Sequence, residues 1–348
     1  MPAMPPFELG LYTFGDITPE LGGVTPQQRL LDVIDEARLA DEVGLDVFGV
    51  GEHHRPDFPI SVPAVVLAAI AERTTNIRLT SSVNVLSSDD PVRVFQQFAT
   101  LDLLSDGRAE IMAGRGSFTE SFPLFGYDLR DYDSLFAEKL EMLLEIRQSE
   151  RLTWSGNHRP PVEDRGIYPR PVQDPLPVWI AIGGTPQSAV RAGVLGLPLA
   201  LAIIGGEPAR FAPFAELFRR ATKEAGHEPL PFSINVHGFL ADESQDASDA
   251  AWPATKLLMD RIGRERGFAS VGREAYEAGH GLHGHTFTGS PQQVIDKILY
   301  NHEIFENDRF LMQFIVGSLE HAKVMRAIEL FGTEVAPVVR EEVAKRRP

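Results

Sequence analysis

One pattern recurs along most of the chain: a short apolar run, a polar loop, and a longer stretch whose apolar residues recur at helical spacing. Eight apolar runs are predicted to form strands, at residues 7–14, 46–52, 77–86, 108–116, 178–184, 197–204, 232–241 and 309–317. The helices predicted to accompany them lie at residues 25–44, 61–75, 90–107, 133–149, 185–196, 207–226, 290–305 and 318–343. Strands that are apolar throughout and alternate with helices indicate a parallel sheet buried on both faces.

The number of these units favours an α/β fold, a (β/α)8 TIM barrel with insertions, formed by residues 1–348 as a single domain. An open doubly wound sheet is the alternative, but it would favour a glycine fingerprint after the first strand, and GDITPELGGV is not one. Residues 150–177, rich in proline and charge, are predicted to form an insertion loop with a short hairpin. Residues 242–288 combine a helical stretch with a Gly- and His-rich piece, which we interpret as a lid-like insertion.

Composition and charge remove several classes of function. The 348 residues carry a formal net charge of −16, which argues against nucleic acid or an anionic membrane surface as a partner. The chain contains no cysteine, so disulfides, thiolate catalysis and iron–sulfur clusters are excluded. It has neither an apolar stretch of about 18 residues nor the basic and apolar regions of a secretory signal, and we expect a cytoplasmic protein.

The segment EHHRPDF at residues 52–58 follows the second predicted strand, where a TIM barrel carries its chemistry. It has three interpretations. A metal site would need further ligands, and no other His-rich strand end completes a set. A structural cluster would have Glu52 orient a histidine through a hydrogen bond. Alternatively, a histidine serves a bound ligand as proton donor or hydrogen-bond partner, because its pKa lies near neutrality.

Three further loops combine glycine with features that bind anions. GGTPQSA at residues 183–189 and GSPQQV at residues 289–294 each place glycine before a predicted helix start, where the first-turn amides attract negative charge. GRGSF adds Arg115, whose guanidinium can grip a phosphate. Together they suggest a phosphorylated ligand, although Thr-Pro and Ser-Pro are also ordinary helix starts.

These motifs, in this order, resemble the bacterial luciferase-like flavin monooxygenase family over about residues 7–343. The most specific part is PVRVFQQFATLDLLSDGRAEIMAGRG at residues 91–116; EHH, GLP at residues 196–198 and GSPQQVIDKI agree with it. The resemblance implies a (β/α)8 barrel that binds reduced flavin at its carboxyl-terminal mouth, usually as a dimer. A cysteine of the luciferases aligns with Gly114, and GGTPQSA is similar to the non-luminescent branch, so we expect a member that emits no light.

The resemblance also assigns roles to individual residues. His53, the first histidine of EHH, would be catalytic, and Glu52 would fix its tautomer. Arg115 and the loop after the fifth strand would bind the flavin phosphate, and a non-proline cis peptide bond would lie beneath the flavin ring. No metal is expected, and the cofactor-binding residues implied are Ser82, Val83, Arg115, Gly183, Gly184, Thr185 and Ser188.

The predicted function is that of a flavin-dependent monooxygenase or oxidoreductase that uses reduced FMN and dioxygen on a small organic substrate. No nicotinamide-binding domain is recognisable, so a separate flavin reductase would supply the reduced FMN. The helices at residues 61–75 and 90–107, rich in small and apolar residues, would form a homodimer interface. A deazaflavin coenzyme that transfers hydride is a less favoured alternative, and two alternatives come from other classes: a non-catalytic flavin-binding protein and a metal-dependent barrel hydrolase.

Overall fold

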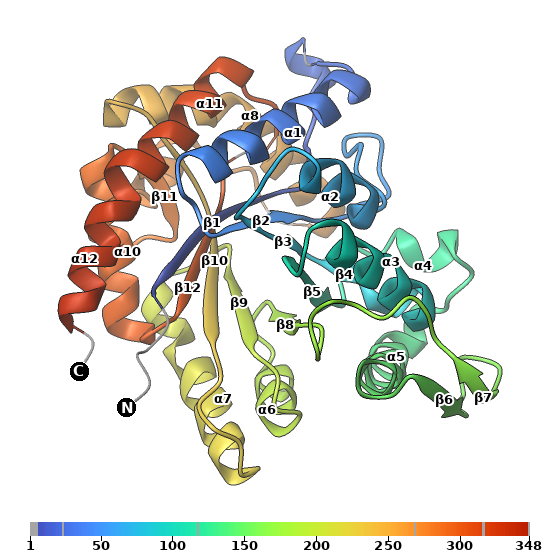
Figure 1. Cartoon of the computed structure of the whole chain (residues 1–348). Coiled ribbons are helices and arrows are strands. Elements are labelled where there is room, and N and C mark those ends of the chain that lie inside the picture. The colour runs from blue at the N-terminus through green and yellow to red at the C-terminus, as the bar shows by residue number, and fades with distance from the viewer. Residues whose placement is uncertain (1–5, 23, 117, 268, 315–316, 347–348) are drawn as a thin grey trace.

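The computed structural model describes residues 6–22, 24–116, 118–267, 269–314 and 317–346. Eight parallel strands form the barrel: β1 (Glu8–Thr13), β2 (Val47–Val50), β3 (Arg78–Ser81), β5 (Ala109–Gly114), β8 (Val178–Ile182), β9 (Leu199–Ile203), β10 (Phe232–Leu240) and β12 (Arg309–Gln313). Because β12 pairs with β1 and β10 pairs with both β9 and β12, the ring closes (Figure 1). The predicted (β/α)8 barrel is confirmed. Of the expected last strand, residues 315–316 lie outside the described residues.

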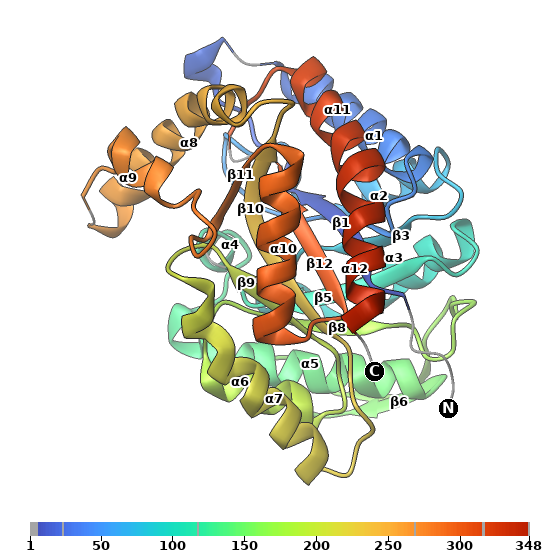
Figure 2. The same ribbon diagram turned by 90° about the vertical axis from the view of Figure 1, so that its left-hand side faces the viewer.

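Helices surround the barrel and alternate with its strands (Figures 1 and 2). They are α1 (Pro26–Glu42), α2 (Pro63–Ala71), α3 (Pro91–Leu104), α5 (Tyr132–Gln148), α6 (Pro186–Val194), α7 (Ala212–Glu224), α10 (Pro291–Phe305), α11 (His321–Leu330) and α12 (Ala336–Arg346). A π-helical turn at Phe331–Val335 joins α11 to α12. Short 3-10 turns lie at Pro19–Leu21, Leu86–Ser88, Leu129–Asp131 and Pro208–Phe211, and a one-turn helix, α4, at Ser121–Leu124.

Three segments depart from the simple strand–helix alternation. The strand expected at residues 77–86 is interrupted after β3 and resumes as the two-residue β4 (Asn84–Val85), which pairs with β5. The proline-rich insertion contains an antiparallel hairpin of β6 (Arg151–Trp154) and β7 (Val162–Gly166). After β10 come α8 (Ser244–Arg266), α9 (Arg273–Ala278) and β11 (Thr286–Gly289), a strand that the sequence pattern does not predict and that pairs with β10.

Side-chain caps explain where several helices begin. Thr25 accepts a hydrogen bond from the amide of Gln28 at 3.1 Å and precedes a proline at the first helical position, as the sequence predicts for α1. Asp90 caps α3 in the same way, because its carboxylate accepts from the amides of Val92 and Arg93. These caps fix the helix starts close to the carboxyl ends of the preceding strands.

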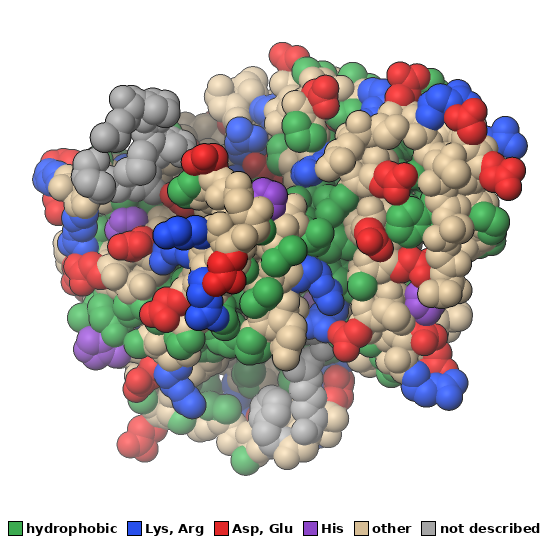
Figure 3. Space-filling model, turned by 90° about the horizontal axis from the view of Figure 1, so that it is seen from below, with side chains coloured by type: hydrophobic (Ala, Val, Ile, Leu, Met, Phe, Trp, Pro, Cys, Tyr) green, Lys and Arg blue, Asp and Glu red, His purple; other side chains and the backbone are tan. Residues whose placement is uncertain are grey.

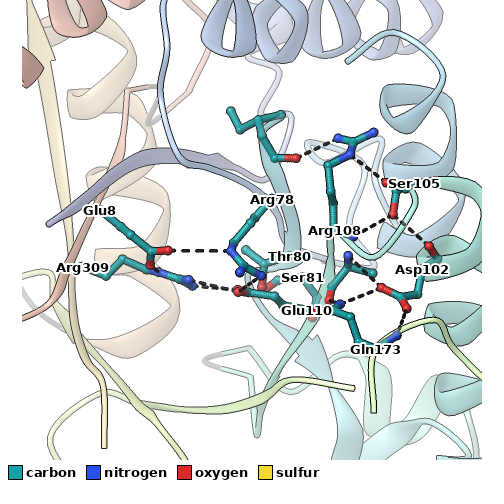
Figure 4. A network of polar contacts seen from close by, with 12 residues as sticks. Glu8, Arg78, Thr80, Ser81, Asp102, Ser105, Arg108, Glu110, Gln173 and Arg309 are labelled. Carbon is teal, nitrogen blue, oxygen red and sulfur yellow. Dashed lines mark hydrogen bonds and ion pairs between the residues drawn. The ribbon is translucent and has the colours of Figure 1, made fainter. Parts of the chain in front are cut away.

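Paired charges, of which those of Arg309 and Glu110 are buried, lie at the amino ends of the barrel strands (Figure 4). The fully buried guanidinium of Arg309 pairs with Glu110 at 2.7 and 3.0 Å and with Glu8 at 2.7 Å, while Arg78 reaches Glu110 at 3.3 Å. Arg309 also stacks over the ring of Trp179, 4.2 Å from its centroid. Because paired charges plug this end, space for a ligand inside the ring of strands remains at the carboxyl ends.

The middle of the stretch most specific to the resembled family, residues 101–108, lies on the same side of the barrel (Figure 4). Asp102 accepts from the amide of Ala109 at 3.2 Å and from Gln173 at 2.7 and 2.9 Å, which joins α3, β5 and the insertion. Arg108 donates to four backbone carbonyls in and after α2 and after α3. This middle part therefore holds the fold together away from the carboxyl-terminal mouth, whereas the last residues of the stretch, Gly114 and Arg115, lie at the carboxyl end of β5.

The surface mixes charge types. On the face in Figure 3, Lys and Arg side chains are interspersed with Asp and Glu, with hydrophobic patches between them. No helix in the described part of the chain is long and apolar enough to cross a membrane.

Candidate active site

The carboxyl ends of the barrel strands surround a mouth with an apolar floor. Phe14, Val83 and Ala181 are partly buried and pack on a layer of side chains inside the barrel: Tyr12, Val47, Met112, Trp179, Ala200 and Leu311. An apolar floor of this kind suits a flat aromatic ligand, since such sites are lined mainly by hydrophobic side chains.

Two glycines bring the segment at Ser82 and Val83 to this mouth. A Cβ at Gly51 would lie 2.3 Å from the carbonyl oxygen of Ser82, and a Cβ at Gly114 would lie 2.8 Å from Cγ2 of Val83. Larger residues would push the segment aside, so the position that aligns with the luciferase cysteine has no room for a side chain here. The peptide bond between Ser82 and Val83 is cis, as the resemblance implies.

His53 is buried in a cage of phenylalanine rings. Its ring centroid lies 4.6 Å from that of Phe14, 4.5 Å from Phe58 and 4.7 Å from Phe118, and 7% of the residue is exposed. Its amide donates to the carbonyl of Ile60 at 3.1 Å, which fixes the backbone of the loop. Burial lowers the pKa of His53, so its imidazole is neutral at pH 7.

Glu120 is the carboxylate beside His53, a residue that the motifs in the sequence do not identify. Its Oε1 lies 3.6 Å from Nδ1 of His53 and accepts from the amide of His54 at 3.3 Å. Burial alone would raise the pKa of Glu120, but these contacts hold it below its usual value, so the carboxylate is ionised. Its place in a loop after a barrel strand was the available clue, but a loop sequence does not reveal which way a side chain faces.

Glu52 does not orient His53, and that prediction is wrong. Its Oε1 accepts from the amide of Val85 at 3.1 Å and lies 3.8 Å from Nε2 of His54, and Oε2 accepts from Asn84 at 3.4 Å. Burial raises the pKa of Glu52, and the contact with Glu52 raises that of His54. Consecutive side chains of this loop thus point in different directions, and Glu52 anchors the β4 segment.

Three of the predicted phosphate-binding residues converge. Nη2 of Arg115 lies 3.4 Å from the hydroxyl oxygen of Thr185 and 3.3 Å from that of Ser188, and Nη1 pairs with Asp133. The guanidinium stacks over the ring of Tyr132, 5.0 Å from its centroid. The arrangement presents one cation and two hydroxyls at the same point, which is the donor set that a phosphate requires.

The start of α6 completes this cluster. Thr185 occupies its N-cap but makes no side-chain cap hydrogen bond, so its hydroxyl is available to a ligand. Gly184 adopts a φ of +107°, and no atom lies within 4 Å of a Cβ added at Gly183. A larger side chain at Gly183 would project into this space, so the residues present fit an anionic group at the helix start.

The GSPQQV motif at residues 289–294 has an ordinary structural role. Ser290 and Gln293 form a capping box at the start of α10, and Oε1 of Gln293 accepts from the amide of Ser290 at 3.1 Å and from the hydroxyl of Ser244 at 2.6 Å. This motif follows β11 and does not join the Arg115 cluster.

The histidine-rich segments do not assemble a metal site in the described part of the chain, where no three His, Asp or Glu side chains converge on one point. His54 faces Glu52, while His53 lies among aromatic rings. The metal interpretation of EHHRPDF therefore finds no support in this geometry.

Ion pairs tie the insertion after β10 to the loop at residues 51–60. Arg55 donates to Glu265 of α8 at 3.0 and 2.6 Å, and Arg261 of α8 pairs with Asp57. The Arg55–Glu265 pair is bidentate, and both pairs hold α8 against the loop that carries the caged histidine.

Known proteins share both the sequence and the fold. The profile of the family described as luciferase-like monooxygenase matches residues 7–306. The chain is 33% identical over 175 residues to F420-dependent glucose-6-phosphate dehydrogenase of Amycolatopsis mediterranei (strain U-32), which covers 47% of this chain and 51% of that protein. It is 32% identical over 189 residues to N-acetyl-S-alkylcysteine monooxygenase of Bacillus subtilis (strain 168), with 53% and 54% covered. The crystal structure of monooxygenase RslO1 from Streptomyces bottropensis shares the fold, with a TM-score of 0.83, 23% identity, and 95% and 99% of the two chains covered.

Proposed function

Because the chain belongs to the luciferase-like monooxygenase family, we propose that it is a flavin-dependent monooxygenase that uses reduced FMN and dioxygen to oxidise a small organic substrate. One observation carries the proposal. The cation and two hydroxyls around Arg115 and the caged, neutral His53 are placed by loops at the same end of one barrel, around an apolar floor. That combination suits a ligand with an anionic tail and a flat ring beside a proton-handling group.

The residues present would hold the parts of FMN separately. Arg115, Thr185 and Ser188 would bind its phosphate, and Val83 with Ala181 would lie against its ring. Reduced flavin, when bound, supplies the electrons with which dioxygen is activated.

The side chains around His53 would then control protons and water. Neutral His53 can donate one proton or accept one at a ring nitrogen, and ionised Glu120 beside Nδ1 favours the tautomer that carries its proton there. The rings of Phe14, Phe58 and Phe118 keep bulk water from the imidazole. The insertion held by Arg55 and Glu265 would act as a lid that closes the mouth.

Two partners follow as further parts of this proposal. A separate flavin reductase would deliver the reduced cofactor, since none of the motifs in the chain is typical of a nicotinamide dinucleotide site. A second copy of the chain would cover α2 and α3, where Val65, Leu103 and Leu104 are exposed apolar side chains. A dimer in sedimentation equilibrium that dissociates on Val65→Glu would support this; a monomer in the unaltered protein would contradict it.

Anaerobic titration tests the cofactor. We expect reduced FMN to bind the full chain and, on admission of dioxygen with a substrate, to support oxygen insertion. The same titration with reduced coenzyme F420 is the comparison, because a deazaflavin transfers hydride. Tight binding of F420 with no binding of FMN would replace the monooxygenase proposal by that of a hydride-transfer oxidoreductase.

A further inference from the structure

A cavity of about 180 Å³ lies between the carboxyl ends of β9, β10 and β12 and the insertion helices α8 and α9. Ile204 and His237 line it from the barrel, and Trp252 and Tyr276 line it from the insertion. Figure 2 shows α8 and α9 together beside β10 and β11. None of these lining residues belongs to the Arg115 cluster or to the cage around His53.

Two residues of the cavity wall, Ile204 and His237, come from the carboxyl-terminal parts of barrel strands or directly after them. Ile204 directly follows β9, whose Ala200 packs inside the barrel. Asn235 donates to the sulfur of Met112 inside the barrel at 3.9 Å, and His237 follows it by two residues on β10. The alternation of side chains along β10 therefore turns His237 toward the barrel interior, near the carboxyl end of that strand.

The lining is electrically neutral. Among the described residues, no Asp, Glu, Lys or Arg lines the cavity. Burial lowers the pKa of His237 to about 4 and also lowers that of His285, so both imidazoles are uncharged at pH 7. The ammonium of Lys297 on α10 is engaged by the carbonyl oxygens of Gly281 at 2.8 Å and Thr286 at 2.7 Å. An anion entering the cavity would lose its hydration and meet no cation.

One polar atom in the cavity wall lacks a well-formed hydrogen bond. Tyr276 is 8% exposed, and its hydroxyl oxygen is shielded from solvent. The hydroxyls of Thr255 and Thr288 lie close to it, but neither is in good hydrogen-bond geometry. Its ring is held 5.0 Å from that of Trp252 and 4.4 Å from that of His280, measured between centroids. A buried hydroxyl in this state is costly, and a ligand in the cavity is the partner that would satisfy it.

Size limits the ligand further. A cavity of about 150 Å³ lined by apolar side chains holds one benzene ring, so the volume of 180 Å³ suits a single ring with a small substituent. We propose that this cavity binds the organic substrate, and that the substrate is an uncharged, largely apolar molecule with one ring and one oxygen atom that reaches the hydroxyl of Tyr276. That the ligand is the substrate rests on the proposed function, but binding of the ligand to the cavity is tested without any coenzyme.

Three probes of nearly equal size separate shape, charge and hydrogen bonding. Acetophenone carries a neutral carbonyl, ethylbenzene replaces that carbonyl by a methylene group, and benzoate carries a charge. Ligand-observed NMR titration of the full chain at pH 7 should show acetophenone bound most tightly and benzoate at least about tenfold more weakly. Equal or tighter binding of benzoate, or no binding of acetophenone, would overturn the proposal.

Tyr276→Phe removes the one hydroxyl and keeps the ring. Acetophenone should bind this variant roughly two- to tenfold more weakly, because one neutral hydrogen bond is lost, while ethylbenzene should bind as before. Tyr300→Phe is the matched control, since Tyr300 packs on His283 outside the cavity and its loss should leave both affinities unchanged. An equal loss of affinity for acetophenone and ethylbenzene, or no loss of affinity for either, would show that the hydroxyl of Tyr276 does not bind the oxygen of the ligand.

The two proposals fail in different ways. If acetophenone binds as expected but neither reduced FMN nor F420 binds, the neutral-ligand site stands and the flavin-dependent activity falls. If a reduced coenzyme binds but the chain does not discriminate acetophenone from benzoate, the activity stands and this assignment of the cavity is wrong.

Discussion

Replacing Arg115 tests whether the carboxyl-terminal mouth is built around a phosphate. Arg115→Met keeps the length and apolar stem of the side chain and removes the guanidinium. In the structure that guanidinium faces the hydroxyls of Thr185 and Ser188 and pairs with Asp133. The hydroxyls and the start of α6 remain in the variant, so the cation alone is changed.

The expected magnitude follows from the contacts. Hydrogen bonds to charged groups contribute about 1.5–3 kcal/mol, and a phosphate would take at least one from Arg115. Binding would also disturb the pair with Asp133, but the side chain of Asp133 is 78% exposed, and such surface pairs contribute at most about 1 kcal/mol. The net loss of about 0.5–3 kcal/mol means that affinity for FMN should fall roughly twofold to 150-fold.

Riboflavin isolates the phosphate, because it has the same ring and lacks that group. Anaerobic fluorescence titrations with reduced FMN and reduced riboflavin should show a lower affinity for FMN only. The difference in affinity between the two ligands should therefore become smaller in the variant. Arg130→Met is the charge-matched control, since Arg130 is exposed and pairs with Asp128. An equal loss for both ligands would mean a distorted mouth, and an unchanged FMN affinity would refute the phosphate site.

Three further predictions concern the histidines and the insertion. His53→Ala should retain FMN binding but lower substrate oxidation by roughly a hundredfold, the usual contribution of a proton-transfer group, with more hydrogen peroxide per turnover in a peroxidase-coupled assay; unchanged coupling would exclude His53 from the chemistry. Burial lowers the pKa of His237 to about 4, so on acidification its imidazole is protonated in the unfolded chain before it is protonated in the folded one. The contribution of neutral His237 to stability is therefore full above pH 6.5 and is lost as the pH falls toward 4. The free energy of unfolding, measured with urea, should therefore fall between pH 7 and pH 5 by about 2 kcal/mol less in His237→Asn than in the unaltered protein. An equal fall in both proteins would count against a buried neutral imidazole. Arg55→Met removes the contact with Glu265 and should speed amide exchange in α8 by up to about fivefold at low salt, a difference that should shrink as salt is added; equal exchange rates would show that this pair does not hold the insertion.

The barrel itself could be predicted from the sequence because its strands are buried on both faces. Runs such as VWIAI in β8 and LALAI in β9 are apolar throughout, and the helical stretches between them are long and well capped. Two strands, β4 and β11, could not be predicted from the sequence pattern, for a physical reason. β4 has two residues, and β11 lies in a Gly- and His-rich stretch whose pairing with β10 depends on tertiary contacts.

The candidate site was predictable in part. The loop after each strand could be located, and the resemblance gave Arg115, Thr185 and Ser188, which the structure brings together. The partners of the histidines could not be predicted, because EHHR forms an irregular loop rather than a strand. Without a regular period, sequence spacing does not fix which way Glu52 points, and the carboxylate beside His53 comes from Glu120, 67 residues later.

The middle of the most family-specific stretch and the proposed substrate cavity lie in different parts of the barrel, so the resemblance indicates the fold more directly than it indicates the substrate. Asp102 and Arg108 make hydrogen bonds that join α2, α3, β5 and the insertion, so this part of the stretch stabilises the fold. The cavity is lined instead by β10, which carries His237, and by the insertion after it, which carries Tyr276; its surface is uncharged and has one hydroxyl that lacks a well-formed hydrogen bond. Because a substrate is selected by the groups that it leaves paired or unpaired on binding, the choice of substrate should change with substitutions among the residues that line the cavity, while the fold and the proposed cofactor site stay the same.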